Sequence, residues 1–191
     1  MSNQESLDNA LEENDVDAFV ALLNRPNVDV DFFTDDGTPL LAEALNRGYV
    51  QIAMALVRAG ADVNLGNNGL VRGKYRGKTP LNGAICLELN CPQHVPEQDR
   101  VLVPGLVQYL IDHGARARLT RVTDFDVSPL QMCLFHRHDL SSLDADSESD
   151  TAKINPKFWG LLKILLRAGA KREDLLESFH EAYDDVIQKI E

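Results

Sequence analysis

The chain has 191 residues, of which 44% are hydrophobic, 26% charged and only 6% aromatic. The low aromatic content argues against a β-sandwich, and the net charge of −11 disfavours binding to a nucleic-acid backbone over the whole surface. The three cysteines have no disulfide-framework spacing. There is no basic-then-apolar leader and no apolar run long enough to cross a membrane. We therefore expect a cytoplasmic protein, or one exported by a route without a classical signal peptide.

The first predicted elements lie between residues 5 and 34. Leu7, Ala10 and Leu11 have helical spacing, and a second apolar stretch follows at residues 16–23. This pattern predicts two short helices in a degenerate first unit.

Residues 35–66 have the clearest pattern. Thr38-Pro39-Leu40 is typical of a helix start, because the hydroxyl caps free N–H groups and Pro needs no donor at the first position. Gly60 follows the apolar stretch 52–57 and is typical of a helix stop, because glycine enters the left-handed region easily. Two short helices are predicted between start and stop.

The same two motifs return twice, at wider spacing. Starts recur at residues 79–81 and 128–130, and stops at Gly114 and Gly169. The three glycine stops are separated by 54 and 55 residues. The excess length predicts a long hairpin at 65–76 and two insertions between paired helices, at 89–101 and 139–156. Because equivalent positions of stacked units are neighbours, we expect the insertions side by side, away from the hairpins.

The last predicted element is a capping helix within residues 172–191. Its apolar residues have helical spacing, with charges on the other face. They are Leu175, Leu176, Phe179, Ala182, Tyr183, Val186 and Ile187. Such a helix is expected to cover the open end of a repeat array.

The unit from Gly37-Thr38-Pro39-Leu40 to Gly60-Ala61-Asp62-Val63-Asn64 resembles the ankyrin repeat, and the resemblance extends over about residues 5–171. It implies an all-α ankyrin-repeat solenoid of about four helix-turn-helix units with hairpin loops, two long inter-helix insertions and a C-terminal capping helix. We expect one domain, 1–191, with its units and cap at about 5–34, 35–66, 74–118, 124–171 and 172–191. The histidine usual after the Thr-Pro-Leu motif is absent, since Leu41, Asn82 and Gln131 stand there.

The resemblance also implies a partner-binding surface on the concave side, made of hairpin tips and first helices. The candidate partner-binding residues are Phe33, Asp35, Arg47, Arg72, Lys74, Tyr75, Arg76, Lys78, Arg118, Arg121, Phe125, Phe135 and His136. The basic cluster around Tyr75 predicts a partner with an acidic patch, since Tyr and Arg often dominate binding energy. Solvated hairpin side chains, and phenylalanines packed between hairpins, remain alternatives.

The cysteines and histidines near the insertions are of residue types that can bind a metal. Cys86, Cys91 and His94 lie near the first insertion, and Cys133, His136 and His138 lie at the corresponding place in the next unit. Stacking could bring these zinc-binding residue types together. However, Cys-x4-Cys-x2-His is not a standard zinc spacing, and Cys133 falls where a small buried residue is expected. No metal and no cofactor are therefore expected.

Catalysis is not expected either. No nucleophile elbow, HExxH or paired-carboxylate motif is present, and residues 73–79 lack the spacing of a phosphate-binding loop. We expect a monomeric, non-enzymatic protein–protein interaction module with no nucleic-acid or membrane partner. The alternatives are a dedicated inhibitor or immunity-type protein, or an acidic nucleic-acid mimic that blocks a basic site. An enzyme of unrecognised type is the less favoured alternative.

Overall fold

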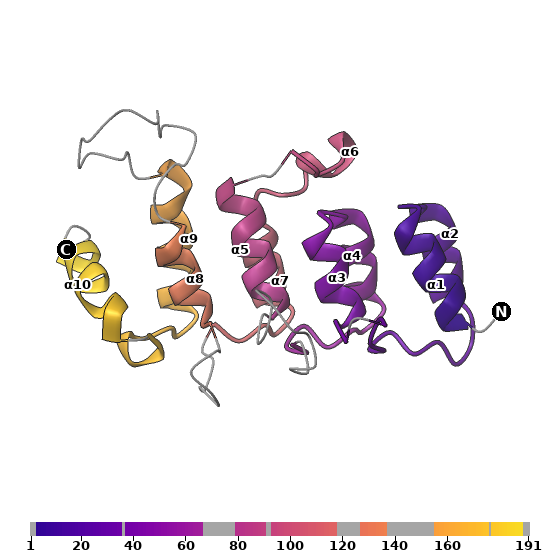
Figure 1. Cartoon of the computed structure of the whole chain (residues 1–191), viewed down its shortest axis with the longest axis horizontal. Helices are drawn as coiled ribbons and strands as arrows, with labels where there is room; N and C mark the ends of the chain where they lie inside the picture. Colours follow the sequence, from indigo (N-terminus) through magenta and orange to yellow (C-terminus); the bar gives the residue numbers. More distant parts are fainter. Residues whose placement is uncertain are drawn as a thin grey trace.

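The computed structural model is a row of helix pairs followed by a C-terminal helix (Figure 1). It describes residues 3–35, 37–66, 79–90, 93–117, 127–136, 155–175 and 177–188. The pairs are α1 (Asn3–Glu12) with α2 (Val16–Leu23), α3 (Leu40–Asn46) with α4 (Val50–Arg58), α5 (Pro80–Asn90) with α7 (Leu106–Asp112), and α8 (Pro129–Phe135) with α9 (Pro156–Arg167). Within the described residues there is no strand, only an isolated bridge between Phe33 and Pro39. The all-α solenoid prediction is confirmed.

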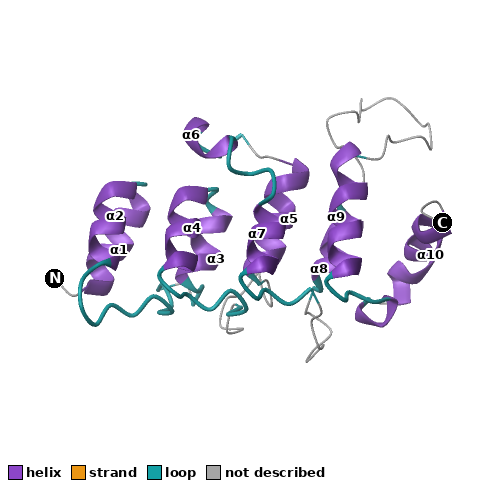
Figure 2. Cartoon of the chain, turned by 180° about the vertical axis from the view of Figure 1, so that it is seen from behind, coloured by secondary structure: helices purple, strands orange, loops and turns teal. Residues whose placement is uncertain are grey.

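The helix pairs stack side by side, through first helices in the middle of the row and through second helices at its N-terminal end. α5 lies between α3 and α8, and α2 contacts α4 in the second row. Described loops between the pairs run along one edge of the stack (Figure 2). No helix in the described part of the chain is both long and apolar enough to span a membrane. The first helices α1, α3, α5 and α8 are called the first-helix row below.

The buried core is continuous along the stack because no pair can bury its apolar side alone. Its largest fully buried side chains come from successive units and include Phe19, Leu45, Leu56, Ile85 and Phe158.

All three predicted glycine stops are confirmed. Gly60, Gly114 and Gly169 have φ angles of +94°, +95° and +95°. The following residue closes each turn; the N–H of Ala61, for example, donates to the carbonyl of Leu56 at 3.0 Å. This left-handed bonding pattern satisfies carbonyls that the helix end leaves free, which is why glycine recurs there.

Left-handed residues also connect the helices within the first two pairs. Asn14 (φ 51°) joins α1 to α2, and Gly48 (φ 74°) joins α3 to α4. The next N–H donates back into the preceding helix in both turns, from Asp15 to Ala10 and from Tyr49 to Ala44, at 2.9 Å.

Helices begin at all three predicted motifs, but the predicted side-chain cap holds at only one of them. Ser128 caps α8, where its Oγ accepts from the N–H of Gln131 at 3.1 Å. At α3, the capping position is Pro39 and no side chain caps it, so the prediction for Thr38 is wrong. The carbonyl of Thr38 instead accepts from the N–H and hydroxyl of Thr34, at 2.9 and 3.1 Å, and closes the hairpin.

The motif at Thr79 also lacks a side-chain cap, for a different reason. The carbonyl of Thr79 accepts from the N–H groups of Asn82 and Gly83 as the first turn requires. Its hydroxyl, however, is buried without a hydrogen-bond partner among the described residues. The predicted side-chain cap at Thr79 is therefore also wrong.

Polar side chains link each hairpin to the next one. The carboxylate of Asp31 accepts from the N–H of Asp62 at 2.8 Å. One unit further, Asn64 donates to the carbonyl of Gly114 at 3.0 Å and accepts from the N–H of Arg116 at 2.8 Å. These links fix the spacing of consecutive hairpins.

The first insertion folds back over the preceding unit. It contains the short helix α6 (Glu97–Arg100). Val95 is 1% exposed and packs on Gly48, and the buried carboxylate of Asp99 accepts from the N–H of Gln51 at 2.7 Å. This bond caps α4 from a segment 48 residues further along the chain.

The expected side-by-side arrangement of the two insertions is only partly described. Residues 139–154 of the second insertion lie outside the described residues. At its end, Asn155 caps α9 through Lys157 N–H and donates its amide to the carbonyl of Leu89 at 2.7 Å. This bond joins the end of the second insertion to the beginning of the first.

α7 also receives its cap from another helix. Its N-terminal position is Gly105, which has no side chain to offer. The buried Glu88 of α5 accepts from the N–H of Val107 at 2.6 Å. Burial raises the pKa of Glu88, and the N–H groups at the start of α7 oppose this shift.

The C-terminal cap begins with two short 3-10 turns, η2 (Arg172–Asp174) and η3 (Glu177–Phe179), before α10 (His180–Gln188). The continuous helical spacing predicted from Glu173 is therefore wrong before residue 180. The carboxylate of Asp174 accepts from the N–H of Lys171 at 2.7 Å, which closes a tight turn at this point. Leu175 and Val186 are buried and belong to the core.

Candidate partner-binding site

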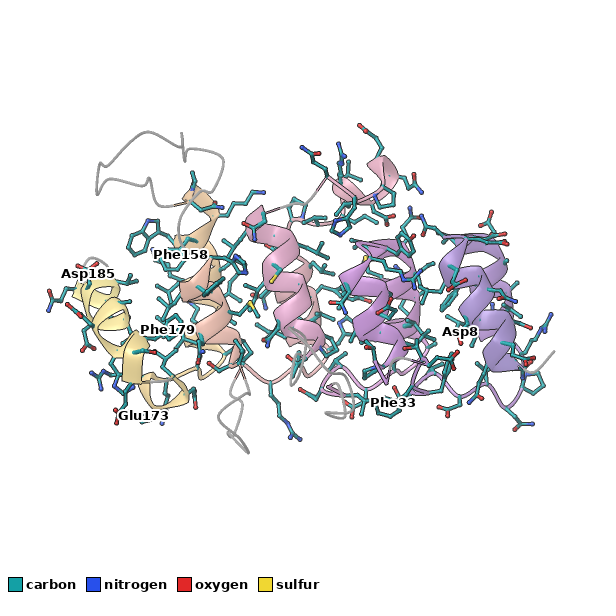
Figure 3. The ribbon with its side chains drawn as sticks, in the orientation of Figure 1. Asp8, Phe33, Phe158, Glu173, Phe179 and Asp185 are labelled. Carbon is teal, nitrogen blue, oxygen red and sulfur yellow. The ribbon has the colours of Figure 1, made fainter. Side chains whose placement is uncertain are left out.

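A groove of about 730 Å³ lies at the N-terminal end of the first-helix row, between α1 and α3. The described residues that line it carry five carboxylates and a single guanidinium. These are Glu5, Asp8, Glu12, Asp35, Glu43 and Arg47. Figure 3 shows Asp8 beside the space between the first two pairs, and Phe33 at the hairpin edge below it. We call this feature the acidic groove.

Three of the carboxylates come from one face of α1. Glu5, Asp8 and Glu12 are three and four residues apart, so they project from the same side of the helix. Leu7 and Leu11 are buried in the core. The amphipathic pattern of α1 thus orients its acidic side along the groove.

The opposite wall of the groove combines a hairpin with the end of α3. The hairpin that carries Asp35 is closed by the N–H of Gly37, which donates to the carbonyl of Thr34 at 2.8 Å. On α3, Arg47 Nε lies 2.6 Å from Glu43 Oε1, and this hydrogen bond raises the pKa of Arg47. The only cation among the described lining residues is therefore already engaged with a carboxylate.

The electrostatics of the groove are unfavourable without a bound cation. Partial burial, then repulsion from Asp35 and Glu12, raises the pKa of Asp8. Arg47 only partly offsets this effect. A basic group placed between the two walls would stabilise the ionised carboxylates.

Three of the residues predicted for partner binding lie together here. Asp35 and Arg47 line the acidic groove. Phe33, on the same hairpin as Asp35, is 39% exposed, whereas its neighbour Phe32 is buried in the core. The alternative that these phenylalanines pack inside the protein therefore holds for Phe32.

Phe135 and His136 lie elsewhere, at the end of α8 beside α5. Phe135 is 68% exposed, and its ring meets the ring of His136 edge-on at a centroid distance of 5.0 Å. His136 Nε2 lies 3.6 Å from the sulfur of Cys86 on α5. The structure thus separates the described candidate residues into two places.

The other eight candidate residues fall outside the described residues. They are Arg72, Lys74, Tyr75, Arg76, Lys78, Arg118, Arg121 and Phe125. The basic hairpin cluster and its acidic partner patch therefore stay predictions.

The cysteines and histidines considered for zinc do not form a metal-binding group within the described residues. Cys133 is completely buried, and this burial raises the pKa of its thiol to about 12. His94 is exposed on the first insertion. Cys91 and His138 lie outside the described residues. Of the six residues, the structure brings Cys86 and His136 together.

Sequence reasoning missed most of the acidic groove. The first unit was predicted to be degenerate, and none of its carboxylates was among the candidate residues. The spacing of Glu5, Asp8 and Glu12 was the available signal, because it places three like charges on one helical face. Glu43 had no such signal, since only the stacking of the second helix pair on the first brings it to the groove.

The first insertion creates a smaller, more apolar pocket of about 230 Å³ between α4 and α7. Its lining includes Met54, Leu102, Pro104 and Tyr109. Val101, also in the lining, is 79% exposed. The insertion therefore exposes apolar surface away from the acidic groove.

Comparison with known proteins identifies the repeat. The family model of the ankyrin repeat matches residues 35–68, which include both motifs of the most regular unit. The solved human ASB11 ankyrin repeat domain is similar at 24% identity and a TM-score of 0.47, over 87% of this chain and 70% of that chain. A comparison with curated proteins returned no significant match.

The described helix pairs form an all-α solenoid, and its unit at residues 35–68 matches the ankyrin repeat, as the resemblance predicted. Ankyrin repeats are in general protein–protein interaction modules and typically carry no enzymatic activity.

Proposed function

We propose that this chain binds a protein partner through its first-helix row and hairpins, and that a basic segment of the partner occupies the acidic groove. The main support for this proposal is the composition of the groove. Its described lining has five carboxylates and one guanidinium, that of Arg47, which already pairs with Glu43. Burial, then repulsion from neighbouring carboxylates, raises the pKa of Asp8, and a lysine or arginine side chain would favour its ionised form.

The rim of the groove adds an apolar contact. Phe33 is partly exposed on the hairpin that also carries Asp35. Aromatic side chains, phenylalanine included, are enriched at protein–protein interfaces. The proposed partner segment therefore combines basic residues with an apolar side chain.

The predicted basic hairpins extend this proposal to a partner with charges of both signs. The cluster from Arg72 to Lys78 would contact an acidic patch, while the groove holds basic residues. We also propose that the chain acts as a single monomeric domain in a reducing compartment such as the cytoplasm, where Cys86 and Cys133 persist as thiols.

The groove is tested by titrating the ¹⁵N-labelled protein with an arginine-rich peptide that contains one phenylalanine. We expect amide shift changes confined to α1, the first hairpin and α3. The variant Glu12→Lys should weaken binding about 5- to 30-fold, because one attractive charge becomes repulsive. A matched control is Glu181→Lys, which makes the same charge change on exposed α10.

Two results would contradict the groove. One is a set of shift changes spread evenly over the acidic surface, and the other is equal weakening by both lysine variants. The predicted hairpin site is tested separately. Replacing Tyr75 and Arg76 with alanine should weaken a partner isolated by pull-down and identified by mass spectrometry, without unfolding the protein.

A second candidate is an inhibitor that uses its acidic surface to occupy a basic cleft. The alignment of Glu5, Asp8 and Glu12 along one helical face favours it. In that case the chain should compete with a polyanion such as heparin for the same basic target. A partner that binds both at once would exclude this function.

A further inference from the structure

Three polar side chains converge between α5 and α8, away from the acidic groove. The sulfur of Cys86 lies 3.6 Å from Nε2 of His136, and the amide nitrogen of Asn90 lies 3.2 Å from Nδ1 of the same ring. Cys86 and Asn90 are four residues apart on α5 and therefore share one face of it. The helix orients both side chains toward one imidazole.

The two contacts determine which nitrogen of the His136 ring carries the proton. The amide N–H of Asn90 donates to Nδ1, so the proton of the neutral ring resides on Nε2 and is directed at the sulfur. A donor directed at sulfur favours the thiolate, the reactive form of cysteine. Asn90 acts through the ring and is a positioning residue.

The surroundings allow a reagent to reach this thiol. Cys86 is partly exposed, His136 is partly exposed and Asn90 is exposed. Cys133, on the neighbouring helix, shows the contrast, because it is completely buried and burial raises the pKa of its thiol to about 12.

We propose that Cys86 is a site of reversible S-thiolation by low-molecular-weight disulfides, activated by His136 and oriented by Asn90. The sulfur of Cys86 attacks one sulfur of the disulfide R–S–S–R. A Cys86–S–S–R bond forms as the original S–S bond breaks. The Cys86 thiol gives its proton to solvent and Nε2–H of His136 stabilises the thiolate, while the departing RS⁻ takes a proton from solvent and leaves as RSH. Cys86 is oxidised and one RS group is reduced, so no further oxidant is required.

The test uses dithiodipyridine, an uncharged disulfide whose released thione is followed by absorbance. The protein is the full chain with Cys91→Ser, which leaves Cys86 and Cys133 as reporters. Under native conditions at neutral pH we expect one rapid equivalent, located at Cys86 by mass spectrometry. The rapid phase should disappear in Cys86→Ser, and dithiothreitol should restore the free thiol.

Histidine variants test the activation. His136→Ala should slow the reaction about three- to tenfold, because the loss of thiolate outweighs its lower nucleophilicity. Asn90→Ala, on an exposed position, should slow it less and leave the unfolding midpoint unchanged. His94→Ala is the matched control, an exposed histidine on the first insertion, and should react as rapidly as the parent.

Three outcomes would overturn the proposal. They are a rapid adduct at Cys133, no adduct at Cys86 under native conditions, and equal rates for His136→Ala and His94→Ala. If His136→Ala does not fold, by circular dichroism, the comparison of Asn90→Ala with the parent decides. An unchanged rate in that folded variant contradicts the proposal.

Discussion

The pairs α3–α4 and α5–α7 solve the same connection in different ways. In the regular pair, a single left-handed glycine, Gly48, turns the chain from one helix to the next. In the interrupted pair, an insertion replaces that turn. Carboxylates from other segments cap the first turns of the second helices α7 and α4. Glu88 caps α7, and Asp99 of the insertion caps α4 in the preceding unit. The comparison shows that the first insertion is an integral part of the stack.

The largest expected effect comes from the point where the two pairs meet. In Gly48→Ala, the new Cβ would lie 2.7 Å from Val95 Cγ2 and the residue would retain a φ near +74°. We expect a loss of about 2–4 kcal/mol in the free energy of unfolding, from strain plus the clash with the insertion. Equilibrium urea denaturation measures it.

Gly60→Ala is the matched control for this prediction. It has a similar φ of +94°, but its Cβ would meet nothing within 4 Å. It should lose only about 1–2 kcal/mol, the strain alone. Truncating Val95 to alanine in the Gly48→Ala background should recover part of the clash. Equal losses in the two glycine variants would show that the insertion does not press on Gly48.

A smaller effect is expected from the cap that the insertion provides. Asp99→Ala removes the acceptor for Gln51 N–H and should cost about 1–2 kcal/mol. Asp99→Asn should cost less, because it retains an oxygen at the cap and removes a charge whose burial raises the pKa of Asp99. Thermal unfolding of both variants measures the difference.

The control for the cap is Glu97→Ala, an exposed residue on the same short helix, which should be nearly neutral. A loss at Glu97 equal to that at Asp99 would mean that α6 itself, rather than the cap, carries the stability.

The smallest expected change in stability comes from Asp8 in the acidic groove, and it contrasts the groove with the first insertion. Because the pKa of Asp8 is raised, the native state retains the Asp8 proton to a higher pH than the unfolded chain does. Its ionisation therefore lowers stability as pH rises above the ordinary value of 3.8. Asp8→Asn should remove this loss and stabilise the protein by no more than about 0.5 kcal/mol at pH 7.

The same variant should weaken binding of the arginine-rich peptide while it stabilises the fold. Urea denaturation at several pH values between about 4 and 7 checks the stability part. A variant that is destabilised at pH 7 would show that Asp8 is not under repulsion in the groove.

The sequence predicted the glycine helix ends better than the side-chain caps at the helix starts. Gly60, Gly114 and Gly169 end their helices as expected, because a left-handed turn depends on the local chain alone. Thr38 and Thr79 do not cap through their side chains, although Ser128 does. The three motifs are alike in sequence, so the difference comes from the hairpin or neighbouring unit that each one meets.

For the candidate sites, the sequence identified parts without their arrangement. It singled out Asp35, Arg47, Cys86 and His136, but the acidic groove also needs α1, and the activated thiol also needs Asn90. Each site is assembled across two units, from residues that are tens of positions apart.

The sequence by itself determined the repeat, the class of fold and the ends of the second helices, because helical periodicity and glycine conformation act within a few residues. Only the tertiary structure decided that the first insertion caps the preceding unit, that five carboxylates meet in one groove and that Cys86 faces His136. These outcomes depend on how neighbouring units stack, and stacking is set by packing and hydrogen bonds over the whole array.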